Sequence, residues 1–98
     1  MASSAVQIEV HGRVQGVGFR AWTGQMAAMF DLSGWARNRH DGWVEIVLSG
    51  PSDRIDAALV MMERGPPGAR VENVAVRPAE PSEVALGPAG EFAVLGDL

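Results

Sequence analysis

The chain has 98 residues, a formal net charge of −4, 47% hydrophobic residues and no cysteine. This length and apolar content predict one compact domain over residues 1–98, with a core over about residues 6–95. The missing cysteines exclude disulfides, thiolate nucleophiles and cysteine-ligated zinc or iron–sulfur sites, and the acidic balance argues against binding to a nucleic-acid backbone.

The first predicted elements are a strand, a glycine-rich loop and a helix. Apolar and polar side chains alternate over residues 6–10, which is the period of a half-buried strand. Residues 12–18 contain three glycines and suit neither a helix nor a strand. The next stretch predicts a helix, because four apolar residues recur on one face. These are Trp22, Met26, Met29 and Phe30.

A hairpin and a second helix follow in the sequence. Residues 32–38 and 43–48 are predicted strands on either side of Asp41-Gly42, a strong hairpin signal. Ser52 is expected to cap the second helix, which ends at Gly65-Pro66. The apolar stripe of this helix consists of Ile55, Ala58, Leu59 and Met62.

The last third of the chain predicts a strand, a loop and a short final strand. Residues 70–77 are strand-like, with a disturbed phase at Val71 that a β-bulge would explain. Residues 78–90 are expected to form a loop, and Phe92 with Val94 indicates the final strand. The order βαββαβ with one extra strand predicts an α+β, ferredoxin-like sandwich. Its antiparallel sheet would have four to five strands, with two helices on one face.

The glycine-rich loop before the first helix is suited to hold an oxyanion. Its glycines let successive backbone N–H groups converge, and the helix that follows adds unpaired donors and the positive end of its dipole. Arg20 lies where the loop becomes helix, so its guanidinium could bind two oxygens of a phosphoryl group. Four arginines and a single acidic residue lie between His11 and His40, which makes this segment a plausible anion site. The arginines are Arg13, Arg20, Arg37 and Arg39.

Other readings of these residues are weaker. Residues 16–21 match the dinucleotide fingerprint G-x-G-x-x-A, but the hairpin that follows and the short chain do not suit two mononucleotide-binding halves. The Gly-Lys-Ser/Thr of a Walker A loop is absent. His11 and His40 lack a metal-ligand spacing and are expected to be solvated. The tryptophans are expected in the core or half-buried in the sheet rather than as a base-stacking surface. They are Trp22, Trp35 and Trp43.

Two segments together resemble the paired signatures of the acylphosphatase family. They are GRVQGVGFR at residues 12–20 and GWARN at residues 34–38, the second followed by Asp41-Gly42. Thr23 and the pairs Gly50-Pro51 and Gly65-Pro66 also agree, so the resemblance extends from roughly Val6 to Val94. It implies a ferredoxin-like fold and hydrolysis of the carboxyl–phosphate bond of acyl phosphates, without a metal or another cofactor.

The resemblance also implies roles for particular residues. Arg20 matches the family's catalytic arginine and Asn38 its catalytic asparagine. We expect Arg20 and the loop amides to bind the phosphoryl oxygens, and Asn38 to hold the attacking water. The expected phosphate-binding residues are Gln15, Gly16, Val17, Gly18, Phe19 and Arg20, and no metal ligand is expected.

Two other functions stay open. The chain could be a non-catalytic ferredoxin-like binding or regulatory module, although the absence of an aromatic RNP-type strand weakens RNA binding. It could also be an acyl- or carbamoyl-phosphate-binding domain of a larger carbamoyl-transfer enzyme, although the strand near Leu98 favours a standalone enzyme. The sequence from Met1 shows no leader pattern and no membrane-spanning apolar run. We therefore expect a cytoplasmic monomer that binds a small acyl phosphate and neither a membrane nor nucleic acid.

Overall fold

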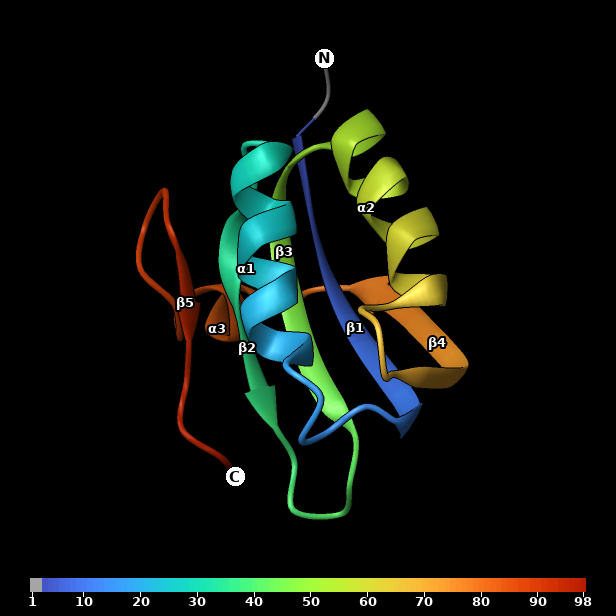
Figure 1. Ribbon diagram of the computed structural model, residues 1–98. Coiled ribbons are helices and arrows are strands. Elements are labelled where there is room, and N and C mark those ends of the chain that lie inside the picture. Colours follow the sequence, from blue (N-terminus) through green and yellow to red (C-terminus); the bar gives the residue numbers. More distant parts are fainter. Residues whose placement is uncertain (1–2) are drawn as a thin grey trace.

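The computed structural model describes residues 3–98, whereas Met1 and Ala2 of the predicted domain lie outside the described residues. Strands and helices alternate along the chain in the predicted βαββαβ order, followed by two short elements (Figure 1). The elements are β1 Ser3–Arg13, α1 Phe19–Met29, β2 Ser33–Asn38, β3 Val44–Pro51, α2 Ser52–Arg64, β4 Arg70–Pro78, α3 Pro81–Val84 and β5 Phe92–Val94. This order confirms the ferredoxin-like α+β prediction.

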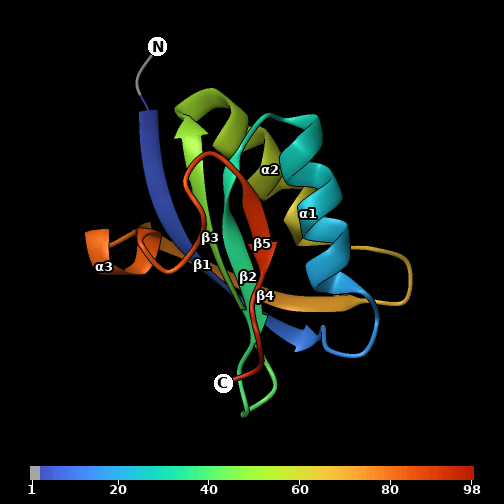
Figure 2. The same ribbon diagram turned by 90° about the vertical axis from the view of Figure 1, so that its left-hand side faces the viewer.

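One five-stranded sheet has the order β4-β1-β3-β2-β5. β1 is antiparallel to both β3 and β4, and β2 is antiparallel to β3, as predicted. β5 differs, because it pairs with β2 in parallel and makes the sheet mixed. The physical reason lies in the long connection after β4, which crosses one face of the sheet and turns back along the opposite edge (Figure 2).

α1 and α2 cover the other face of the sheet, and the core lies between these two layers (Figure 1). In α2 the predicted stripe is correct, with Ile55, Ala58 and Met62 buried and Leu59 partly buried. In α1 the predicted stripe is wrong at its edge, because Met29 is 67% exposed. The buried side of α1 begins at the first helical residue, and it consists of Phe19, Thr23, Met26 and Ala27.

The crossing segment contains a short helix, α3, where a loop was predicted over residues 78–90. Pro81 begins this helix, and the Glu83 carboxylate accepts a hydrogen bond of 2.8 Å from the Glu80 N–H. The indole of Trp35 donates to the Glu83 carbonyl at 2.7 Å, and Trp35 is fully buried. A proline at the first helical position with a glutamate two residues later is the signal that could have predicted this helix.

Local features at the ends of elements agree with the sequence in two of three cases. The pairing of β1 with β4 shifts between His11 and Gly12, which leaves an extra residue in β4 and confirms the bulge next to Val71. Gly65 ends α2 with a φ of 71°. Ser52 does not cap α2, since it is the first helical residue and Pro51 holds the cap position.

Within residues 3–98 no helix combines the length and the apolar character needed to cross a bilayer.

Candidate active site

The loop between β1 and α1 presents a row of unused backbone donors. Gly16 and Gly18 have φ values of 75° and 80°, a left-handed conformation that other residues rarely adopt. A Cβ at either position would have no atom within 4 Å, so the backbone conformation alone explains these glycines. Among residues 3–98 no acceptor is hydrogen-bonded to the backbone N–H groups from Gln15 to Arg20. Such consecutive donors at a helix N-terminus form an anion-binding concavity.

A cavity of about 190 Å³ opens at this loop. Its lining residues come from the loop, the start of α1, the end of β2 and the end of β5. They are Val14, Gly16, Gly18, Phe19, Arg20, Ala21, Asn38 and Val94. The fold therefore brings Arg20 and Asn38, which are 18 positions apart in the sequence, to one cavity that also includes three other predicted loop residues. One water needs only about 10–15 Å³, so the cavity has room for a phosphoryl group and a water.

Two predicted phosphate-binding residues, Gln15 and Val17, are not among the cavity lining. The Gln15 side chain contacts the hairpin, because its amide nitrogen donates to the Arg39 carbonyl at 2.7 Å and to the Trp43 carbonyl at 3.0 Å. Both acceptors belong to the turn between β2 and β3. Gln15 thus ties the loop to the hairpin that carries Asn38, a contact that the sequence pattern did not indicate.

Asn38 lies at the end of β2, and the residue is only 8% exposed. Its backbone is held on both sides, by pairing with Val44 of β3 and by the Leu98 N–H, which donates to the Asn38 carbonyl at 2.9 Å. Its side-chain carboxamide makes no hydrogen bond within residues 3–98. An amide with no protein partner that lines a cavity is available to a ligand or to water.

Arg37 and Arg39 belong to the arginine-rich segment of the sequence, but they do not line this cavity. Successive side chains of a strand point to opposite faces, so the neighbours of Asn38 turn to the other side of the sheet. There Glu45 Oε1 accepts from Arg37 Nε at 2.8 Å and from Arg39 Nη1 at 3.1 Å. Gln7 Nε2 donates to Glu45 Oε2 at 3.1 Å. These arginines therefore neutralise a buried carboxylate and fix β2 to β3 beside Asn38.

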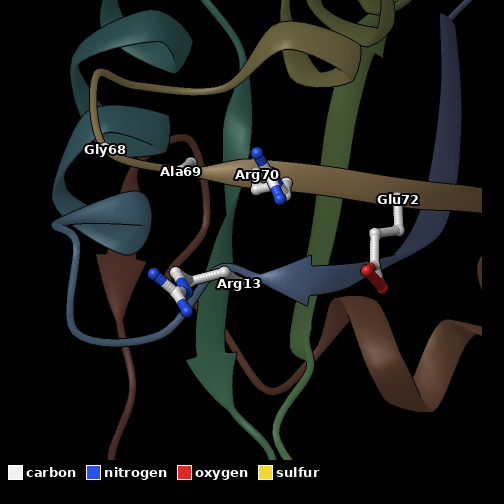
Figure 3. A pocket seen from close by; sticks show the side chains of 5 residues that line it. All are labelled: Arg13, Gly68, Ala69, Arg70 and Glu72. Carbon is white, nitrogen blue, oxygen red and sulfur yellow. The ribbon is translucent and has the colours of Figure 1, made fainter.

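Arg13 lines a separate cavity of about 470 Å³ at the edge formed by β1 and β4. Figure 3 shows Arg13 at the end of β1 and Arg70 at the start of β4, with Glu72 farther along that strand. Arg13 and Arg70 are directly opposite in the strand pairing, and neither forms an ion pair within residues 3–98. Of the four arginines in the predicted segment, Arg20 is the one that lines the cavity with Asn38.

Arg20 has a partner that the sequence did not suggest. Its Nη1 lies 3.0 Å from Asp97 Oδ1, and its side chain is 32% exposed. The two histidines lie elsewhere: His11 Nε2 is 3.1 Å from Glu9 Oε1 and its ring stacks on Trp43, while His40 is exposed in the turn. His40 is solvated as expected, whereas the ring of His11 is partly covered by its two contacts.

Comparison with known proteins agrees with this geometry. The Acylphosphatase family model matches residues 6–89. An acylphosphatase of Cupriavidus metallidurans is 52% identical over 75 residues, which are 76% of this chain and 79% of that protein. The structure of an acylphosphatase from Coxiella burnetii matches with a TM-score of 0.84 and 32% identity, and covers 95% of this chain and 93% of that chain.

A longer protein also contains a similar part. The structure of full-length HypF in its phosphate- and nucleotide-bound form matches with a TM-score of 0.82 and 29% identity. The match covers 98% of this chain but only 12% of that chain. The family model matches residues 6–89, which are 84 of the 98 residues, and the first relative is of nearly equal length. This chain therefore belongs to the acylphosphatase family.

Proposed function

We propose that this chain hydrolyses acyl phosphates to a carboxylate and inorganic phosphate in the cavity formed by the loop, Arg20 and Asn38. The observation that carries the proposal is the meeting of three unused sets of polar groups at one place. These are the backbone donors of Gly16, Gly18, Phe19 and Arg20, the remaining N–H groups of the Arg20 side chain and the Asn38 carboxamide. Membership of the acylphosphatase family supports the same activity.

The loop and Arg20 would bind the phosphoryl group. Backbone N–H groups in a left-handed glycine turn are fixed before the substrate arrives, so they stabilise developing charge without reorganising. The guanidinium fork adds charge-assisted hydrogen bonds to the same oxygens. Catalysis requires these contacts to be stronger in the transition state, where charge spreads over the phosphoryl oxygens.

Asn38 would orient the attacking water. A neutral amide holds a water by donating or accepting a hydrogen bond, but it does not remove a proton at neutral pH. The water oxygen therefore forms a bond to phosphorus while the bond between phosphorus and the acyl oxygen breaks. One proton of the water passes to a phosphoryl oxygen, and the electron pair of the broken bond leaves with the carboxylate.

The composition of the cavity suits this leaving group. Arg20 and Asn38 are the two lining residues with polar side chains, so the lining contains no carboxyl or imidazole that could act as a general acid. A carboxylate is a stable leaving group and needs no proton for departure. The apolar wall of Val14, Ala21 and Val94 is a surface on which the acyl group can lie.

A phosphate-release assay with acetyl, benzoyl and carbamoyl phosphate tests the proposal. Arg20→Gln and Asn38→Ala are each expected to lower kcat/KM by about 10²–10³, the range for removing one preorganised donor. Arg13→Gln and Asn73→Ala are the matched controls, since both residues lie outside the cavity. EDTA should leave the wild-type rate unchanged, because we propose that no metal takes part.

The outcomes separate the alternatives. A non-catalytic binding module would release no phosphate above background from any of the three substrates. A carbamoyl-phosphate-handling domain would act on carbamoyl phosphate and leave the other two intact. Full turnover by Arg20→Gln or Asn38→Ala would remove that residue from its proposed role.

We also propose that the protein acts as a cytoplasmic monomer. The supporting observations are the net charge of −4 and the closure of the helix-covered core within one chain. Light scattering coupled to size-exclusion chromatography measures the mass in solution, for which the monomer value is 10.4 kDa. Cell fractionation of the full-length protein tests the location.

A further inference from the structure

The segment after β5 continues along β2 to the marked C-terminal end (Figure 2). The Leu95 N–H donates to the Ala36 carbonyl at 2.8 Å, and the Leu98 N–H donates to the Asn38 carbonyl at 2.9 Å. The Leu98 carbonyl in turn accepts from the His40 N–H at 2.6 Å. These bonds extend the parallel pairing of β5 and fix the backbone of residues 95–98 beside Asn38.

Asp97 projects from this fixed segment to Arg20. The pair Arg20 Nη1 to Asp97 Oδ1 measures 3.0 Å, and no other ion pair involves Arg20 within residues 3–98. α1 has no acidic residue in its first turn, so the positive end of the helix dipole opposes the charge of Arg20. Asp97 supplies the compensating negative charge from 77 positions away in the sequence.

The contact leaves most of the guanidinium free. A guanidinium has five N–H donors in a planar fork, and Asp97 contacts a single nitrogen, Nη1. Nη2 and Nε make no hydrogen bond within residues 3–98. Asp97 can therefore restrain the side chain of Arg20 while the rest of the fork binds a ligand.

We propose that Asp97 is a positioning residue, which orders the Arg20 guanidinium for the phosphoryl transition state; this inference rests on the proposed role of Arg20. An arginine side chain loses considerable rotamer freedom when it is fixed, and a preordered one saves this loss during the reaction. The negative charge of Asp97 also repels a bound phosphate. Asp97 thus assists the chemical step without strengthening the binding of the phosphate ion.

The opposite signs of these two effects define the test on the full-length enzyme. Asp97→Asn should lower kcat about three- to fivefold, the upper range for an exposed ion pair, while the inhibition constant of inorganic phosphate stays equal or falls. Asp97→Glu, which keeps the charge, should recover part of the loss in kcat. Glu91→Gln is the matched control: it removes one negative charge from the segment before β5, and Glu91 makes no ion pair within the described residues. This variant should retain kcat within twofold.

A second measurement does not depend on turnover. Nitrogen relaxation of the Arg20 side chain, without substrate, should show an ordered Nε–H in the wild type and a mobile one in Asp97→Asn. Equal order in both proteins would overturn the inference, as would a kcat within twofold of wild type or a phosphate inhibition constant that rises in parallel. If the wild type released no phosphate from any acyl phosphate, the proposed function would fail, and the relaxation data would still decide whether Asp97 orders Arg20.

Discussion

Gln15 offers a sharp test of how the two halves of the candidate site are joined. Replacing it by methionine keeps the length of the side chain and removes both N–H groups that donate to the turn, at 2.7 Å and 3.0 Å. The two carbonyls are not left without donors, because that of Arg39 also accepts from the Gly42 N–H and that of Trp43 from the Arg39 N–H. The loss is therefore two net hydrogen bonds of about 0.5–1.5 kcal/mol each, with no additional penalty for an unsatisfied group.

We expect Gln15→Met to lower the free energy of unfolding by about 1–3 kcal/mol and the melting temperature by about 4–24 °C, since about 4–8 °C corresponds to 1 kcal/mol in a domain of this size. The effect on activity should be larger than this stability loss implies. The loop would no longer be fixed relative to Asn38, and displacement of a catalytic group by about 1 Å costs on the order of 10²-fold. We expect kcat/KM to fall by about 10–100-fold at a temperature where the variant remains folded.

Thermal unfolding by circular dichroism and the phosphate-release assay measure the two quantities. Gln25→Met is the control, because Gln25 lies on the exposed side of α1 and undergoes the same chemical change. The reasoning would be refuted by a variant that melts earlier but keeps kcat/KM within twofold of wild type. That result would show that Gln15 stabilises the fold without aligning the loop and the hairpin.

Three further predictions concern the loop, the buried carboxylate and the third helix. Gly18→Ala forces a Cβ into a φ of 80° and should lower the unfolding free energy in urea by about 1–2 kcal/mol, with a larger loss of phosphate binding by calorimetry. Glu45→Gln leaves the guanidinium groups of Arg37 and Arg39 without their carboxylate, and should lower the unfolding free energy by about 1–3 kcal/mol in the same urea experiment. This loss is smaller than that for breaking a fully buried ion pair, because the Arg39 side chain is 25% exposed. The hydrogen bond from Arg77 lowers the pKa of the Glu83 carboxyl to about 2, so its contribution to stability is complete above its ordinary pKa and is lost as the pH falls toward 2. The melting temperatures of wild type and Glu83→Gln should therefore differ at neutral pH and converge between about pH 4.5 and pH 2.

The parts of this fold that the sequence predicted are those that depend on local patterns. The alternation around Ile8 predicted β1, and the Asp41-Gly42 turn predicted that β2 and β3 are antiparallel neighbours. The glycines at positions 16 and 18 predicted the donor-rich loop, because glycine adopts a left-handed backbone conformation that other residues rarely adopt. Asn38 could be predicted as a site residue from the family resemblance. The neighbouring residues in the sequence did not predict it, since its burial depends on strand pairing.

The parts that the sequence missed are contacts between side chains and distant backbone or charges. Gln15 meets the hairpin 24 and 28 positions away, and Asp97 meets Arg20 across 77 positions. A periodic pattern contains no information on such pairs, because a glutamine or an aspartate has the same polarity with or without its partner. The sequence also predicted Met29 on the buried side of α1, where the structure has Phe19 instead. Several residues of this helix are apolar, and packing against the sheet determines which of them are buried.

The two links that hold the candidate site together differ in kind, and this difference has a measurable consequence. Gln15 joins the loop to the hairpin through neutral hydrogen bonds that are partly buried, whereas Asp97 joins Arg20 through an ion pair whose carboxylate side chain is 66% exposed. Salt screens exposed charges strongly and neutral hydrogen bonds hardly at all. Raising the ionic strength with a non-binding salt should therefore move the wild-type kcat toward that of Asp97→Asn, while kcat of the variant itself changes little. The ratio of the wild-type kcat to the kcat of Gln15→Met should stay constant over the same range. Both proteins keep the ion pair, and they differ only in neutral hydrogen bonds, which salt hardly screens.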